Sequence, residues 1–111
     1  MLIFSYIVSA SLEAALCYNL YQATGQIPVI YGLLLFSSLL SIPIECSAAG
    51  EQVRSEMKAA GKNMDQYDII SNLARSGIYV AVWAGVLNAD TGALMACGCI
   101  GAAIVLAALQ L

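Results

Sequence analysis

The sequence predicts an all-α integral membrane protein with four transmembrane helices, arranged as two hairpins joined by a polar cytoplasmic helical hairpin. Composition gives the first indication, because 61% of the 111 residues are hydrophobic and only 10% are charged. A soluble domain carries about 25% charged residues. The charges also cluster between Glu51 and Asp68, and four apolar stretches lie outside that segment. Each stretch has about 20 residues, the length of helix that crosses a ~30 Å hydrocarbon core.

The first hairpin is predicted from residues 2–22 and 27–46. Residues 23–26 are short and polar enough to form the turn between them, and Pro28 suits the first turn of a new helix. Pro43 lies near the end of the second span. We expect it to kink that helix, because proline removes one backbone hydrogen bond.

Residues 47–68 are predicted to form a polar helical hairpin that extends beyond the lipid. Opposite charges in its first arm are spaced three residues apart, as on a solvated helix face. Gly61 is suited to end this arm. Asn63 or Asp65 could then cap the next helix.

The second hairpin is predicted from residues 69–87 and 93–111, with a turn at residues 88–92. The four basic residues of the chain lie between the second span and the beginning of the third, at Arg54, Lys58, Lys62 and Arg75. Basic loops stay in the cytoplasm. We therefore expect one membrane domain, residues 1–111, with both termini and residues 50–68 in the cytoplasm.

Several kinds of chemistry are disfavoured by the composition. The chain has no histidine, which removes histidine-ligated haem or zinc and the Ser-His-Asp triad. Cys97 and Cys99 would point to nearly opposite faces of a helix, so neither a metal site nor another cofactor is expected. There is no Gly-rich phosphate loop, and no basic stripe for nucleic acid. We expect no catalytic residues, and at most an accessory subunit of a membrane enzyme complex.

Glu13 is the most informative residue, because it lies in the middle of the first span. A carboxylate at the centre of a bilayer is costly, so it should face protein or a water-filled cavity. Arg75 is a candidate partner: Glu13 and Arg75 lie ~16 Å and ~9 Å from the inner face, a difference that an arginine side chain can bridge. Glu45 is the competing partner for Arg75. Glu13 is thus part of a buried ion pair, a proton- or cation-binding carboxylate, or a contact with another subunit.

Small residues recur along the third and fourth spans at a spacing that lets helices approach closely in lipid. These candidate helix-packing residues are Gly77, Ala81, Gly85, Ala89, Ala93, Cys97, Gly98 and Gly101. Polar side chains within the spans, among them Ser9, Ser37, Ser41 and Asn72, can also hydrogen bond between helices. Both patterns indicate tight helix packing, within the chain or between copies.

The chain length, the four spans and Glu13 in the first span resemble the small multidrug resistance transporters. Residues 77–85 are similar to that family's third-span motif of aromatic residues and glycines. The resemblance implies a dimer in which Glu13 binds protons and substrate in turn. However, residues 51–68 have no counterpart in those transporters and the stretch after Trp83 is shorter than theirs, so no family is assigned. Residues 77–111 also resemble conjugative pilins in composition, since both are rich in Gly and Ala. The size and the number of spans are similar to those of phage and viral membrane proteins, including holins.

The sequence favours a structural or assembly subunit of a larger membrane complex or homo-oligomer. Its expected partners are the lipid bilayer and other membrane subunits or copies of itself, with no nucleic acid. The rival is a small proton- or cation-coupled transporter or channel that uses Glu13, and a further alternative is a pilin-like or phage membrane protein. The discriminating observation is whether Glu13 faces Arg75 or a water-filled cavity.

Overall fold

The computed structural model describes residues 2–62 and 64–109, and the regular structure in this part of the chain is helical, as predicted. Its five helices are α1 (Leu2–Thr24), α2 (Val29–Cys46), α3 (Ala48–Ala59), α4 (Met64–Trp83) and α5 (Ala89–Leu109). Three of them, α1, α2 and α5, are long and apolar enough to cross a membrane. α4 has a similar length but includes Asp65, Asp68 and Arg75, which make it less apolar. That α4 also crosses the membrane, which would make four spans in all, therefore stays a prediction.

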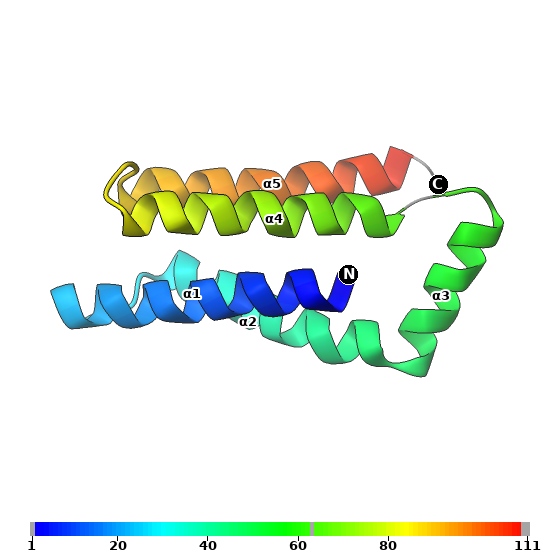
Figure 1. The fold of residues 1–111 in the computed structure, drawn as a ribbon, viewed down its shortest axis with the longest axis horizontal. Coiled ribbons are helices and arrows are strands. Elements are labelled where there is room, and N and C mark those ends of the chain that lie inside the picture. Colours follow the sequence, from blue (N-terminus) through cyan, green and yellow to red (C-terminus); the bar gives the residue numbers. More distant parts are fainter. Residues whose placement is uncertain (1, 63, 110–111) are drawn as a thin grey trace.

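The chain is elongated, with extents of 47 × 24 × 20 Å, and its four long helices form a bundle. α1 and α2 form one antiparallel hairpin, α4 and α5 form the other, and α1 packs against α4 between them. α2 and α5 touch only lightly. Figure 1 shows α3 crossing one end of the bundle, the same end at which α1 begins and α5 finishes.

The predicted polar hairpin at residues 47–68 is wrong in its arrangement. α2 ends at Cys46, and Ser47 caps α3 by accepting a hydrogen bond from the Gly50 N–H at 3.1 Å. Gly50 lies directly against the Ile44 carbonyl, where a side chain would clash. Because glycine has no side chain, the chain can turn sharply here. α3 is therefore a separate helix that crosses the bundle end, and not one arm of a hairpin that extends away from it (Figure 1).

The ends of α3 and α4 differ in how well they were predicted. Gly61 follows α3 with φ of +78°, which confirms its predicted place at the helix end. Asn63 lies outside the described residues, and Asp65 lies in the first turn of α4. α4 is one continuous helix from Met64, so the expected second arm of the hairpin is its first turn.

The turn between α4 and α5 comes earlier than predicted. α4 ends at Trp83 and not at residue 87, because Gly85 adopts φ of +81° and stops the helix. α5 then begins at Ala89, where the carboxamide oxygen of Asn88 accepts a hydrogen bond from the Thr91 N–H at 2.7 Å. The predicted turn at residues 88–92 is thus mostly the first turn of α5.

Polar side chains are buried inside the bundle beside its apolar core, and many large apolar side chains cover its outside. The buried polar residues are Ser5, Ser9, Glu13, Ser38, Ser71, Asn72, Arg75 and Ser76. Exposed apolar side chains occur on every long helix, for example Phe4, Phe36, Val80, Leu94 and Val105. A soluble domain has the opposite tendency, since its charged residues are almost never fully buried and its large apolar ones usually are.

Candidate functional site

Glu13 lies at the centre of a hydrogen-bonded network that joins three helices. Its side chain is 0% exposed. Oε1 accepts hydrogen bonds from Ser9 on α1 (2.9 Å), Ser38 on α2 (3.0 Å), and Tyr79 (2.8 Å) and Arg75 (3.3 Å) on α4. The network therefore ties α1 to both of the helices that pack against it.

Arg75 is positioned by its own helix. Asn72 lies one turn earlier on α4, and its carboxamide oxygen accepts a hydrogen bond from Arg75 Nη2. The amide nitrogen of Asn72 donates to Ser5 Oγ on α1 at 3.1 Å. The guanidinium is thus held between Glu13 and Asn72, and α1 and α4 are joined at two levels.

The Glu13–Arg75 ion pair is almost completely shielded from solvent, with side-chain exposures of 0% and 4%. Removing two charges from water costs several kcal/mol per ion before their attraction offsets it. Such a pair therefore adds little net stability, but separating its members would leave an unpaired charge in the bundle. Its main effect is to fix how α1 and α4 face each other.

Glu45 does not pair with Arg75 in the structure. Its carboxylate and its backbone carbonyl both accept hydrogen bonds from Arg54, which reaches back from α3. Arg54 Nε also lies 4.0 Å from Asp65 on α4. Arg54 thus connects α2, α3 and α4, a role that depends on the turn at Ser47.

A cavity of about 210 Å³, here called the serine cavity, adjoins this network between α2 and α5. Residues from all four long helices line it. Its main polar lining is Ser37, Ser38, Ser41, Asp68, Asn72 and Arg75. Two members of the Glu13 network, Ser38 and Arg75, therefore also face the cavity.

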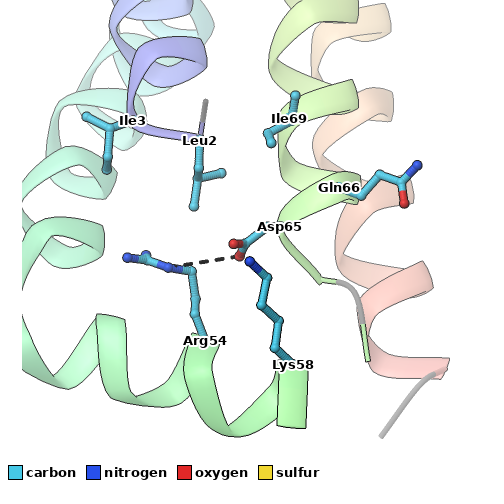
Figure 2. A pocket seen from close by; sticks show the side chains of 7 residues that line it. All are labelled: Leu2, Ile3, Arg54, Lys58, Asp65, Gln66 and Ile69. Carbon is cyan, nitrogen blue, oxygen red and sulfur yellow. Dashed lines mark ion pairs between the residues drawn. The ribbon is translucent and has the colours of Figure 1, made fainter. Parts of the chain in front are cut away.

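A larger cavity of about 550 Å³ lies at the α3 end of the bundle, between α1, α3 and α4. Figure 2 shows Arg54, Lys58 and Asp65 pointing into it, with the apolar side chains of Leu2 and Ile69 opposite. Arg54 is already paired with acidic side chains. This cavity lies at the end of the bundle, apart from the buried ion pair.

The predicted helix-packing residues divide into two groups. Ala93 is buried, and Ala81 and Ala89 are half-buried. By contrast, Gly77, Gly85, Cys97, Gly98 and Gly101 are exposed. A methyl group added at Gly77, Gly98 or Gly101 would meet nothing within 4 Å. The α4–α5 contact instead uses Gly92, which lies against Val82 and Tyr31.

The Glu13 network brings one carboxylate, one guanidinium and three hydroxyl groups together. Within residues 2–62 and 64–109, no three His, Cys, Asp or Glu side chains are grouped closely enough to bind a metal ion. A scan against protein-family models found no match, and searches of the curated proteins and of the solved structures found none either. The function is therefore inferred from the geometry of the chain itself.

Proposed function

We propose that this chain is a four-span integral membrane protein that acts as a structural subunit of a larger membrane assembly, formed with other subunits or with copies of itself. The observation that carries the proposal is the distribution of side chains, with charge at the centre and apolar residues outside. Lipid satisfies such an exterior, as an aqueous environment does not. α4, the third of the four long helices in chain order, fits the remaining span. Its Asn72 and Arg75 face inward, while Ile70, Leu73 and Val80 are exposed.

The exposed small residues on α5 support assembly beyond one chain. Gly98 and Gly101 leave a shallow, open strip between exposed Leu94 and Val105. Small residues of this kind let the backbone of another helix approach closely in lipid. Within the described chain nothing fills this strip, so a second copy or another membrane subunit would supply the packing partner.

Native mass spectrometry of the gently extracted protein tests the subunit role. We expect the wild type to be extracted with copies of itself or with other membrane chains, and Gly101→Leu to dissociate about ten times more readily. Ala14→Leu is the matched control, because Ala14 is an exposed small residue on α1, away from the strip. A wild-type chain extracted as a lone monomer would contradict the proposal, as would equal effects of the two variants.

A second candidate function is proton- or cation-coupled transport through Glu13. The serine cavity favours it, since Ser38 and Arg75 contact both Glu13 and the cavity. Purified protein in vesicles with an imposed pH gradient would be assayed with an internal pH-sensitive dye. We expect proton flux in the wild type and in Glu51→Gln, an exposed control on α3, but not in Glu13→Gln. Equal flux in all three, or none in the wild type, would exclude this function.

A further inference from the structure

The serine cavity lies in one half of the bundle only. Its residues belong to the beginnings of α1 and α4 and the later parts of α2 and α5, which are the halves nearest α3. The other half holds the apolar core, in which the rings of Tyr31 and Tyr79 pack edge to face around Leu16 and Ala96. Access to the ion pair is therefore asymmetric, with a polar cavity on the α3 side and a packed core on the other.

One buried nitrogen at the cavity has no protein partner. Among the side chains that the structure describes, Arg75 Nε is buried without a hydrogen bond. Arg75 is only 3% exposed and lines the cavity. A buried N–H donor without an acceptor costs about 1–3 kcal/mol, so an acceptor in the cavity would stabilise it. A cavity of about 210 Å³ is far larger than the ~15 Å³ that one water molecule needs.

The two carboxylate oxygens of Glu13 differ in how many hydrogen-bond donors they have. Oε1 accepts hydrogen bonds from four side chains, whereas Oε2 has one donor among the described residues, the Ser38 hydroxyl at 3.0 Å, whose single proton it shares with Oε1. Oε2 therefore retains a free lone pair. Ser38, which donates to this oxygen, also lines the cavity.

The charges around the cavity favour protons or water over anions. Asp68 lines it, and Glu45 and Asp65 act on Asp68 through space, with Arg54 and Arg75 opposing them. Asp68 lies near the beginning of α4, just before the span predicted at residues 69–87. Burial, together with the two acidic neighbours, raises the pKa of Asp68 to about 6. A carboxyl group with that pKa can exchange protons near neutral pH.

We propose that the serine cavity is a hydrated access site through which water and protons reach Glu13 Oε2 from the α3 side. Water accepts the Arg75 Nε–H hydrogen bond. A hydronium ion in the cavity gives a proton to the Ser38 oxygen and becomes water, while Ser38 passes its own proton to Oε2, which leaves Glu13 neutral and Arg75 still charged. Tyr6 also lines the cavity, and the Tyr79 hydroxyl donates a hydrogen bond to Glu13 Oε1. The inference rests on the second proposed function, because it uses Glu13 as the proton acceptor.

Thiol labelling of Ser38 and Ser9 provides a matched test. Both serines are buried and both donate to Glu13 Oε1, but only Ser38 lines the cavity. Single Ser38→Cys and Ser9→Cys variants would be made in a chain whose four cysteines are replaced by alanine. A small cationic methanethiosulfonate, added to either side of vesicles holding the protein in one orientation, should label the Ser38→Cys variant from the α3 side at least ten times faster than the Ser9→Cys variant. Labelling of neither variant, labelling of both at the same rate, or labelling of Ser38→Cys from the opposite side would overturn the proposal.

A second, independent test measures the unsubstituted chain, and a variant serves only to assign its signals. Solid-state NMR in bilayers would record magnetisation transfer from water to the Arg75 Nε–H, with Arg54→Lys used to assign the two arginines. We expect rapid transfer, and its absence would overturn the proposal. Proton flux measured on the same vesicles keeps the two ideas separate, because a hydrated Arg75 without flux would refute transport while leaving the access site intact.

Discussion

At the scale of single residues, the Glu13–Arg75 pair decides how α1 docks on α4. We expect Glu13→Gln to reduce the free energy of unfolding by ~3 kcal/mol, because Arg75 is left charged and buried without a counter-charge. The double variant Glu13→Gln/Arg75→Gln removes both charges, so it should be less destabilised than the sum of the two single variants. Thermal or steric-trapping unfolding in one detergent measures this cycle.

Glu51→Gln provides the control for that cycle, since Glu51 is exposed on α3 and should change stability by less than ~0.5 kcal/mol. Strict additivity of the Glu13 and Arg75 substitutions would mean that the pair is not coupled, in conflict with the 3.3 Å contact.

Asp68 gives a residue-scale prediction for pH. Its folded pKa of about 6 lies above its ordinary value of 3.8, so the folded state disfavours the carboxylate. The contribution of protonated Asp68 to the free energy of unfolding is fully present below about pH 4, and it is lost as the pH rises from about 4 to 6. Asp68→Asn should therefore raise stability by about 1 kcal/mol at pH 7.5, after allowance for solvent screening, and leave it nearly unchanged at pH 4. Melting curves at both pH values check this, and an equal shift at both would contradict it.

At the scale of the helices, Gly92 sets how closely α5 approaches its neighbours. A methyl group at this position would run into Val82 on α4 and come within 3.0 Å of the Tyr31 hydroxyl on α2. That hydroxyl donates to the Ala89 carbonyl at 2.6 Å. We expect Gly92→Ala to destabilise the bundle by ~1–3 kcal/mol through this overpacking.

Gly98→Ala is the matched substitution on the same helix, because its added methyl group meets nothing within 4 Å. Alanine also favours a helix over glycine by up to ~1 kcal/mol, so unfolding of Gly98→Ala should be unchanged or harder. Two variants with the same loss of stability would show that α5 does not pack through Gly92.

The helices were predictable where a local signal determines them, and less so where chain geometry does. The spans at residues 2–22 and 27–46 were close to α1 and α2, because long apolar runs end at the turn-forming residues near Gly25. The ends of α4 and α5 were misplaced, because a glycine stops a helix only when it adopts a positive φ, as Gly85 does. Gly85 was instead predicted to be a helix-packing residue, because it lies at a regular spacing from Gly77.

The site shows the same division. The depth of each residue in its span brought Glu13 and Arg75 together, as the structure does. Ser38 was missed while Ser37 was noted, because a one-residue difference is a rotation of about 100° around the helix and the sequence does not fix that rotation. Arg54 was missed as the partner of Glu45, because their contact depends on the sharp turn at Ser47.

At the scale of the whole molecule, the proposed topology has one polar end. α3 lies at the same end as the beginning of α1 and the finish of α5, so an even number of crossings fits the fold (Figure 1). Because Arg54, Lys58 and Lys62 lie at this end, the tendency of basic loops to remain inside makes it cytoplasmic in the proposal. Moving it across the membrane would require all three cations to cross the bilayer.

Three single-cysteine reporters, in the cysteine-free chain, test both the orientation and the fourth span. Gln26 lies in the α1–α2 turn, Lys58 on α3 and Val86 in the α4–α5 turn, and all three are exposed. With an impermeant maleimide on intact cells, we expect Gln26→Cys and Val86→Cys to be labelled at once, and Lys58→Cys only after permeabilisation. The reverse pattern for all three would invert the orientation but keep four spans. Val86→Cys behaving like Lys58→Cys would show that α4 and its inward-facing Arg75 do not cross the membrane, and would contradict the four-span proposal.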